Sequence, residues 1–157
     1  MSAAPSPCAV KRATGSTPEL QQLVAHLWQE LGLLYPELSA ENPKEIGGPR
    51  AGFVVAWLNG GAVGCGAWRP LSADQPEMAE IKRMFVEPAA RGRGISRAIL
   101  SKLEACARAD GYCVVRLETG LRQPTALRLY DTSGYRRIEP YGRYRDDPLS
   151  VCFEKKL

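Results

Sequence analysis

The chain has 157 residues, of which 45% are hydrophobic and 24% are charged, a composition that fits one globular domain and excludes a fibrous or a disordered protein. Its formal net charge is only +4, too small to indicate polyanion binding by itself. We expect one domain over residues 1–157 with a flexible tail at residues 1–7, soluble and cytoplasmic, because the sequence shows no signal peptide and no run of roughly 20 apolar residues. The cysteines are scattered without a C-x-x-C pair, so we expect reduced thiols and no bound metal.

The first half of the chain predicts a strand, a helix and a hairpin. Residues 8–14 alternate loosely and predict an opening strand. Thr17-Pro18-Glu19 offers an N-cap, a proline tolerated in the first turn and an acid that the helix dipole favours. The helix that begins there has an apolar stripe and ends before Pro36; the stripe is Leu20, Leu23, Val24, Leu27, Trp28, Leu31 and Leu34. Residues 36–49 predict a loop. Residues 51–58 and 62–68 then predict a hairpin, because Asn59-Gly60 accepts the positive φ angles of a tight turn.

The second half predicts a βαβ crossover followed by a mixed segment. Residues 79–86 predict a strand in which 80, 82 and 84 face one side and 81, 83 and 85 the other. Apolar residues at 95, 98, 99, 103 and 106 predict an amphipathic helix over 95–109, closed by Gly111. A strand at 113–118, a helix at 124–133 and strands at 135–138 and 151–154 complete the order β-α-β-β-β-α-β-α-β-β. We find no internal repeat and no second domain.

The segment Arg91-Gly92-Arg93-Gly94-Ile95-Ser96 lies between a predicted strand and a predicted helix. A helix start presents unpaired N–H groups and a partial positive charge, and glycine lets the backbone close around an anion. The loop therefore suits a phosphate, although an arginine-rich tight turn remains the alternative. It is neither a Walker loop nor a G-x-G-x-x-G fingerprint.

Charge supports the same interpretation. Residues 1–78 carry five basic and seven acidic side chains, whereas residues 79–157 carry sixteen basic and ten acidic ones. A basic half favours a localised anion such as a phosphorylated cofactor or a nucleic acid. Nucleic-acid binding ranks low because the arginines are not interleaved with aromatics, and we expect neither a nucleic acid nor a membrane as partner.

The stretch from residue 79 to residue 135 carries a set of spaced motifs. It begins with Ala79-Glu-Ile-Lys-Arg-Met-Phe-Val86, continues with Arg91-x-x-Gly94-x-Ser96 and Leu117-Glu118, and ends with Gln123-x-x-Ala126-x-x-Leu129-Tyr130-x-x-x-Gly134-Tyr135. Together these motifs resemble the GNAT superfamily of acyl-CoA-dependent N-acetyltransferases, whose patterns are R-x-x-G-x-[GA] and N-x-x-A-x-x-L-Y-x-x-x-G-F. Ser96 departs from the glycine or alanine of the first pattern and Gln123 from the asparagine of the second. The first half of the chain matches only in the order of its elements.

The resemblance implies a fold and a cofactor. The fold is a GNAT-like α+β domain: a mixed, mostly antiparallel sheet of six to seven strands, with helices on both faces and one βαβ crossover splayed at the cofactor site. The cofactor is acetyl-CoA, used as a co-substrate without a metal. Its pyrophosphate is expected on the amides of the loop and its amide-containing arm on an open strand edge; the expected residues are Met84, Phe85, Val86, Arg91, Gly92, Arg93, Gly94, Ile95, Ser96 and Gln123.

The implied reaction is direct attack of an amine on the acetyl group. An alkyl amine with a pKa near 10.4 is almost fully protonated at neutral pH, so a base is needed. Glu118, acting through a water, and Glu80 are the candidates. The leaving thiolate departs faster when a weak acid protonates it, a role that suits Tyr130, and a backbone N–H near Phe85 suits the developing oxyanion.

Each candidate also has a structural interpretation. Glu118 is equally suited to an ion pair with Arg116 or Arg122, Glu80 to a pair with Lys82, and Tyr130 to core packing. The only histidine, His26, is best interpreted as a surface contact. Cys106 and Cys113 are expected to fill the core. Asp146 and Asp147 lie in the loop 141–148, which helps to choose the acceptor in GNAT proteins; they attract a cationic amine or cap a turn.

We therefore expect an N-acetyltransferase that acts on a primary amine of a small molecule or peptide. The alternative is a regulatory module that binds acyl-CoA without turnover. An edge strand near the C-terminus makes a homodimer one option.

Overall fold

The computed structural model of the chain describes residues 8–37 and 46–157. The expected tail at residues 1–7 and the middle of the predicted loop at 36–49 lie outside the described residues. Within them, strands and helices follow one another in the order that the sequence predicts. The elements are β1 (Ala9–Ala13), α1 (Pro18–Leu34), β2 (Gly52–Leu58), β3 (Gly61–Pro70), β4 (Met78–Val86), α2 (Ile95–Ala109), β5 (Val114–Gly120), α3 (Pro124–Asp131), β6 (Arg136–Ile138) and β7 (Ser150–Lys156).

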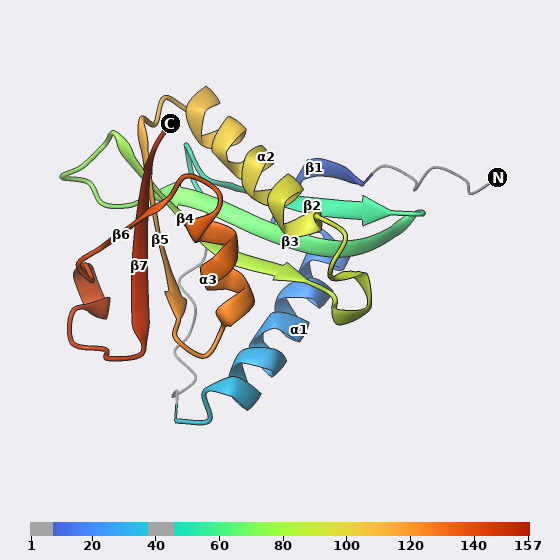
Figure 1. Cartoon of the computed structure of the whole chain (residues 1–157). Helices are drawn as coiled ribbons and strands as arrows, with labels where there is room; N and C mark the ends of the chain where they lie inside the picture. Colours follow the sequence, from blue (N-terminus) through green and yellow to red (C-terminus); the bar gives the residue numbers. More distant parts are fainter. Residues whose placement is uncertain (1–7, 38–45) are drawn as a thin grey trace.

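The strands form one seven-stranded sheet in the order β1-β2-β3-β4-β5-β7-β6. Only β4 and β5 pair in parallel, and every other neighbouring pair is antiparallel. Helices α2 and α3 cover one face of the sheet and α1 covers the other (Figure 1). The expected GNAT-like α+β fold is thus confirmed. None of the helices in the described ranges is long and apolar enough to span a membrane.

Local sequence signals explain the turns. Asn59 and Gly60 have φ angles of 51° and 80°, which gives the tight hairpin between β2 and β3 the backbone twist that it needs. Gly111 follows α2 with φ 90° and Gly134 follows α3 with φ 86°, the left-handed conformation that commonly ends a helix. These positions are the ones at which the sequence predicts that the helices stop.

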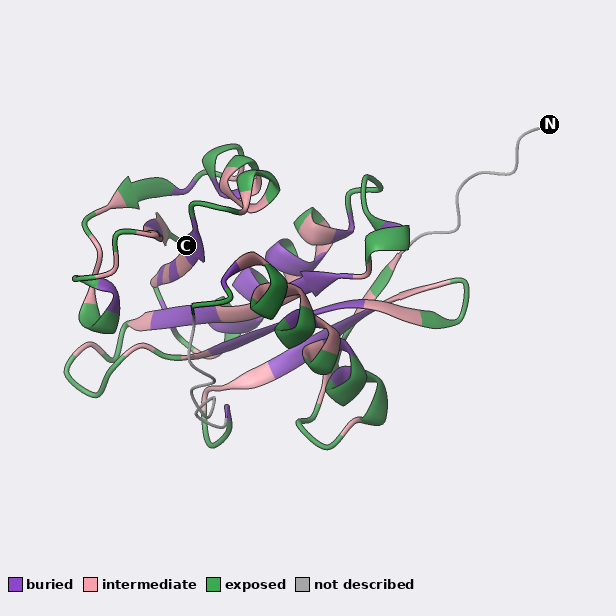
Figure 2. Ribbon diagram, turned by 90° about the horizontal axis from the view of Figure 1, so that it is seen from below, coloured by how far each residue is buried: buried purple, intermediate pink, exposed green. Residues whose placement is uncertain are grey.

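The core has two parts, one on each face of the sheet. On the α2 side, Val54, Ile81 and Leu103 belong to a buried cluster, and on the α1 side Leu23 and Val55 belong to a second one. Burial follows the central strands and the inner sides of the helices (Figure 2). The expectation for Cys106 is confirmed, because its side chain is 2% exposed. The expectation for Cys113 is wrong: it is exposed, because it lies directly before β5 at the end of the sheet, where its backbone bonds to Glu77 and Leu157.

Strand β4 contains a bulge. Cys65 of β3 pairs with Phe85, but Ala67 pairs with Lys82, so β4 carries one extra residue over this stretch. Arg83 has φ 55°, in the left-handed region where few non-glycine residues lie. The strict alternation predicted for residues 79–86 is therefore wrong beyond Arg83, and Phe85 packs on the α1 side although Ile81 packs on the α2 side.

Strands β4 and β5 separate after a short contact. Their parallel pairing covers only Met78–Glu80 and Val114–Arg116, although β4 continues to Val86 and β5 to Gly120. A bulge bends a strand and increases its twist, which explains why β4 turns away from β5 after residue 80. The splay between the carboxyl ends of β4 and β5 is the feature that positions the candidate site.

Candidate active site

The loop before α2 has the backbone of an anion cradle. Gly92 and Gly94 have φ angles of 80° and 77°, and Gly94 is the N-cap of α2. A Cβ at either glycine meets nothing within 4 Å, so the left-handed backbone, not crowding, requires glycine there. No side chain within the described ranges caps the helix, and its first turn holds no acid. The free N–H groups and the positive end of the helix dipole are available to an anion.

Arg91 supports this loop from the side. Its Nε donates to the carbonyl of Val86 at 2.9 Å, and its guanidinium donates to Glu30 of α1 at 2.7 Å. The Arg91 side chain therefore ties the loop to the end of β4 and to α1. Arg93, the second arginine of the motif, is exposed at the surface of the loop.

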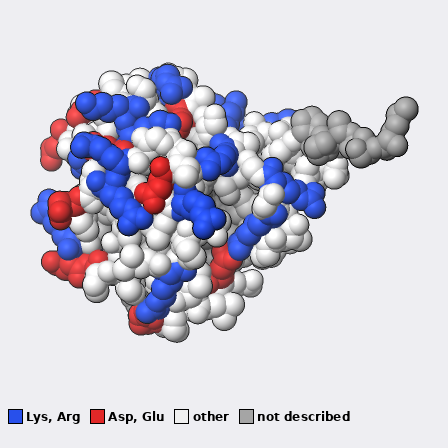
Figure 3. All heavy atoms as spheres, in the orientation of Figure 1, with Lys and Arg blue, Asp and Glu red and all other residues white. Residues whose placement is uncertain are grey.

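Basic side chains gather on the face of the molecule that α2 and α3 form. Figure 3 shows this face, with Lys and Arg spread over it. Arg97 in the first turn of α2 donates to Ser133 at 3.1 Å and to Thr132 at 2.6 Å, which joins the start of α2 to the end of α3. Arg93, in the loop before α2, and Arg128 of α3 are also exposed. The uneven charge that the sequence shows is thus partly concentrated around the start of α2.

Tyr130 lies on the α2 and α3 side of the splay. Its ring packs against Tyr135 and Phe153, with centroid distances of 5.7 and 5.4 Å. Its hydroxyl donates to the sulfur of Met84 at 3.5 Å, from α3 across to the bulged part of β4. Burial raises the pKa of Tyr130 well above its ordinary value, and the negative charge of Glu118 raises it further. The phenol is therefore a neutral proton donor directed at β4.

Glu118 lies on the opposite face of the sheet. Its neighbours Val115 and Leu117 belong to the α2-side core, and side chains alternate along a strand. Its carboxylate accepts a hydrogen bond from Ser150 of β7 at 3.1 Å. Burial raises the pKa of Glu118, while the charge of Lys82 and the Ser150 hydrogen bond act against this rise.

The ion pairs that the sequence offers for Glu118 do not form. Arg116 instead pairs with Glu154 at 2.8 Å, and Arg122 pairs with Glu37 at 2.6 Å. Glu118 is therefore a desolvated carboxylate with a hydroxyl partner, an arrangement typical of a base whose pKa is adjusted toward neutrality.

Glu80 has a different environment. It is 4% exposed and accepts two hydrogen bonds from Arg69 on β3, at 3.1 and 2.8 Å. Tyr141 donates to its other oxygen at 2.7 Å. The prediction that Glu80 pairs with Lys82 is wrong. Arg69 lies opposite Glu80 in the pairing of β3 with β4, and Lys82 donates to the hydroxyl of Tyr144 at 2.6 Å.

Gln123 is the N-cap residue of α3, and its N–H donates to the carbonyl of Gly120 at 3.0 Å. Tyr35, at the end of α1, packs against this turn and accepts a hydrogen bond from the N–H of Arg122 at 3.1 Å. A Cβ at Gly120 would lie 1.7 Å from the Tyr35 hydroxyl, so this close approach requires glycine. The end of β5 is thus fixed from the α1 side.

The comparisons with known proteins agree with this geometry. Residues 49–137 match the family model of the acetyltransferase (GNAT) domain. The chain belongs to the GNAT acetyltransferase family. It is 41% identical over 139 residues to the IAA acetyltransferase of Azospirillum brasilense, which covers 87% of this chain and 89% of that protein.

Two solved structures extend the similarity to the fold of this GNAT domain. A protein from Klebsiella pneumoniae subsp. pneumoniae, assigned as an acyl-CoA N-acyltransferase, has a TM-score of 0.76 and 33% identity, over 96% of this chain and 97% of that one. A GNAT acetyltransferase from Elizabethkingia anophelis, solved with acetyl-CoA bound, has a TM-score of 0.68 and 19% identity, over 96% and 98% of the two chains.

Several residues of this GNAT site were not singled out from the sequence. Lys82, Ser150, Tyr141 and Tyr144 all lie on the face that carries Glu118 or in the loop that covers it. Lys82 lies two residues after Glu80 on the same strand, which places both on one face before the bulge. Ser150 and the tyrosines come from the β6–β7 segment, and only the three-dimensional pairing of β5 with β7 brings them to Glu118.

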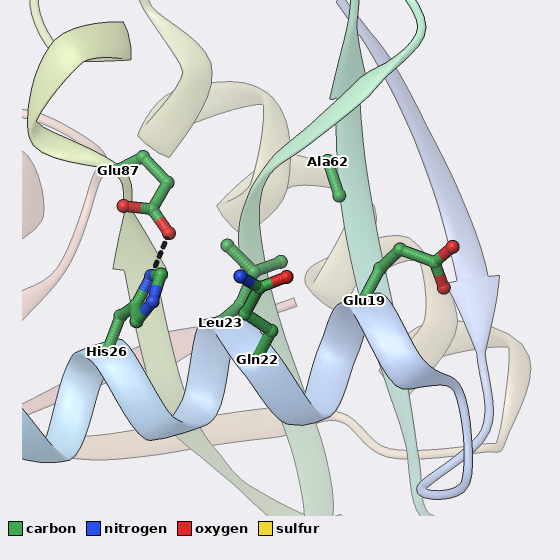
Figure 4. A pocket seen from close by; sticks show the side chains of 6 residues that line it. All are labelled: Glu19, Gln22, Leu23, His26, Ala62 and Glu87. Atoms are coloured by element: carbon green, nitrogen blue, oxygen red, sulfur yellow. Dashed lines mark hydrogen bonds and ion pairs between the residues drawn. The ribbon is translucent and has the colours of Figure 1, made fainter.

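The remaining polar candidates have structural roles. His26 pairs with Glu87, the surface contact that its position predicts. The pair lines a pocket of about 240 Å³ beside α1, which Glu19, Gln22, Leu23 and Ala62 complete (Figure 4). None of the predicted site residues lines this pocket. Asp147 accepts a hydrogen bond from the N–H of Leu149 at 2.9 Å and so caps a turn.

Proposed function

We propose that this GNAT domain transfers an acetyl group from acetyl-CoA to a primary amine of a small molecule or peptide, with Glu118 as the base and Tyr130 as the acid. One observation carries the proposal. The desolvated carboxylate and the neutral phenol lie on opposite faces of the sheet, at the one place where β4 and β5 part. The gap lets two reactants meet from opposite sides, each with its own proton-transfer group.

The residues around α2 fit the cofactor. The pyrophosphate would lie on the N–H groups of residues 92–96, where the two left-handed glycines leave open space. The amide-containing arm would lie along residues 84–86, the part of β4 that β5 does not cover. Gln123, at the start of α3, lies at the facing end of β5. The acetyl-CoA in the Elizabethkingia anophelis structure supports this choice of cofactor, which supplies an acetyl group activated as a thioester.

Of the two carboxylates, Glu118 suits the base better. Arg69 and Tyr141 occupy both oxygens of Glu80, whereas within the described part of the chain the Glu118 carboxylate accepts a hydrogen bond from Ser150 alone. A raised pKa also makes the Glu118 carboxylate a stronger base. Glu118 accepts the proton that the amine releases as its nitrogen bonds to the acetyl carbon, directly or through one water.

Tyr130 completes the proton balance. As the bond from carbon to sulfur breaks, the Tyr130 hydroxyl donates its proton to the departing sulfur. In the structure the same hydroxyl already points at a sulfur, that of Met84. The backbone N–H at Phe85, next to the bulge, is the candidate donor to the oxygen of the transition state.

The test is a thiol-release assay with acetyl-CoA and a panel of primary amines, run from pH 5 to pH 9. Turnover with at least one amine is expected, and Glu118→Gln should remove the acidic limb of the kcat/KM profile. Glu80→Gln is the matched control, and it should keep that limb even if it lowers stability. Loss of the limb in Glu80→Gln alone would transfer the role of base to Glu80, and tight cofactor binding without turnover on any amine would refute the proposal.

The alternative of an acyl-CoA-binding module without turnover is not favoured. Relatives of this chain carry the names of acetyltransferases, and both proposed proton-transfer groups lie beside the splay. Silent Tyr130→Phe and Glu118→Gln variants with measurable CoA affinity would restore it.

A further inference from the structure

Ser150 is the hydroxyl partner of the candidate base, and strand pairing holds it in place. Cys152 of β7 lies opposite Glu118 of β5, so Ser150 is the diagonal neighbour of Glu118 on the same face of the sheet. Its hydroxyl donates to Oε1 of the Glu118 carboxylate at 3.1 Å. A serine has one side-chain torsion besides the rotation of its hydroxyl, so the backbone of β7 largely determines where this donor lies.

The backbone around Ser150 is itself held by hydrogen bonds. The N–H of Ser150 donates to the carbonyl of Asp147 at 3.2 Å, and Ser150 pairs with Gly120 at the end of β5. The carbonyl of Leu149 accepts a hydrogen bond from the N–H of Leu121 at 2.8 Å, which continues the pairing of the two chain segments beyond the strands. The donor is therefore in position before a substrate binds.

The loop that leads into Ser150 is fastened to β4. Tyr141 donates to Glu80 at 2.7 Å, and Lys82 donates to the hydroxyl of Tyr144 at 2.6 Å. The two tyrosine rings meet edge to face with centroids 5.5 Å apart. The carbonyl of Tyr144 then accepts a hydrogen bond from the N–H of Asp147 at 3.1 Å, so these contacts connect β4 to the turn that carries Ser150.

The two oxygens of Glu118 have different surroundings. Ser150 binds Oε1, whereas Oε2 accepts no hydrogen bond within residues 8–37 and 46–157. Both side chains are half-buried, so a substrate can reach the carboxylate. The last torsion of a glutamate is broad, and a fixed donor on one oxygen narrows it. The other oxygen then points in one direction, as a base that acts on a bound amine requires.

The length of the bond decides how far it changes the acidity of the base. A strong hydrogen bond from a hydroxyl to an ionised carboxylate is about 2.5–2.7 Å long, and this one is 3.1 Å. Burial raises the pKa of Glu118 more than Ser150 and the nearby cations lower it. The hydroxyl can therefore orient the carboxylate and still leave it a good base.

We infer that Ser150 is a positioning residue for the acetyl transfer: it holds one oxygen of Glu118 and leaves the other to accept the proton of the amine. The inference rests on the proposed function and adds a residue to it. Ser150 keeps its own proton throughout. The amine proton passes to Oε2 of Glu118, directly or through one water, as the nitrogen bonds to the acetyl carbon.

Ser150→Ala removes this hydroxyl and tests its effect on the base. The acidic limb of the kcat/KM profile should move up by about 0.5–1 pH unit, the equivalent of one hydrogen bond to the charged form. Above the limb, kcat should fall about three- to tenfold, and the KM for acetyl-CoA should stay at the parent value. A serine with only a structural role would lower Tm and leave the limb in place.

Two further variants and one titration complete the test. Ser150→Thr keeps a hydroxyl and suits a strand, so it should restore both the limb and kcat. Ser101→Ala removes an exposed hydroxyl from α2 and should change neither. An NMR titration of the Glu118 carboxyl should show a higher pKa in Ser150→Ala than in the parent chain, independently of turnover.

The outcomes separate this inference from the function on which it rests. If Ser150→Ala keeps the limb and kcat of the parent chain, or if its Glu118 titrates as in the parent chain, the inference is wrong and Glu118 keeps its proposed role. The inference is also wrong if Ser150→Thr folds like the parent chain but restores neither value. If Glu118→Gln keeps the limb, or if no amine is acetylated, the proposed function fails and the inference fails with it.

Discussion

Replacing Tyr130 with phenylalanine should separate catalysis from stability. The substitution removes only the hydroxyl group, and the ring keeps its packing against Tyr135 and Phe153. The hydrogen bond that disappears ends on a thioether sulfur, a weak acceptor. We therefore expect the free energy of unfolding to change by less than about 0.5 kcal/mol.

The effect on turnover should be much larger. A positioned acid contributes about 10²–10⁴-fold to a rate. Burial raises the pKa of Tyr130, which makes the phenol a weaker acid than an ordinary tyrosine, so the lower end of that range applies. We expect kcat to fall about a hundredfold, or about 2.7 kcal/mol of transition-state stabilisation.

Tyr135→Phe is the matched control, since Tyr135 lies five residues later in the same core cluster. Its hydroxyl donates to the carboxylate of Glu104 at 2.8 Å, and Lys155 binds the same carboxylate at 3.1 Å. Losing a buried bond to a charged group costs about 1.5 kcal/mol when another partner remains, which lowers Tm by about 3–6 °C in a domain of this size. Its kcat should stay within about threefold of the parent chain.

The assays are thiol release at saturating substrates and thermal unfolding at pH 7.5. The reasoning predicts that one variant loses turnover and the other loses stability. If Tyr130→Phe turns over at the parent rate, the acid role assigned to Tyr130 is wrong. If it unfolds as readily as Tyr135→Phe, the stability part of the prediction is wrong and a loss of turnover no longer isolates the chemical step.

Three further substitutions test other parts of the structure. Glu118→Gln should raise Tm at neutral pH, because a carboxyl whose folded pKa is raised destabilises the fold when charged, and the gain should vanish as the pH falls through that pKa. Gly94→Ala should raise the KM for acetyl-CoA several-fold and lower the free energy of unfolding by about 1 kcal/mol, because alanine is strained at a left-handed φ. Gly48→Ala is the control: Gly48 has a similar φ of 81°, so this variant should lose stability but keep the parent KM. Glu154→Gln should lower the free energy of unfolding by about 1–2 kcal/mol at neutral pH. Because hydrogen bonding to Arg136 lowers the pKa of Glu154, the difference in stability between the parent chain and this variant should disappear in acid. Urea titrations at pH 7 and pH 3 would measure this difference.

Periodic signals in the sequence were sufficient to predict the order of the strands and helices. Leu20, Leu23 and Leu27 of the predicted stripe are buried on α1, although Trp28 of the same stripe is 43% exposed. The Asn59-Gly60 turn joins β2 to β3. These signals act over a few residues, so neighbouring side chains alone determine them. The position of the Gly94 loop between β4 and α2 follows from the same local patterns.

The partners of the charged residues depended on register, which the sequence does not show. Glu80 faces Arg69 because β3 and β4 align those two positions, and Ser150 reaches Glu118 because β5 pairs with β7. A bulge changes such a register by one residue and moves every later side chain to the other face. Arg83 carries no residue-type signal for a positive φ, since glycine and asparagine are the residues that favour it.

The bulge at Arg83 accounts for the gap beside Tyr130 and Glu118, the proposed acid and base. Without it, β4 would continue beside β5, and their hydrogen bonds would close the gap between Tyr130 and Glu118. With it, pairing ends after Glu80, and the later part of β4 keeps an edge unpaired with β5, on which we propose that the cofactor arm lies. In the proposed reaction the acceptor approaches from the face that carries Glu118. One local departure from regular strand geometry therefore opens the sheet at the place where the proposed reaction brings its two substrates together.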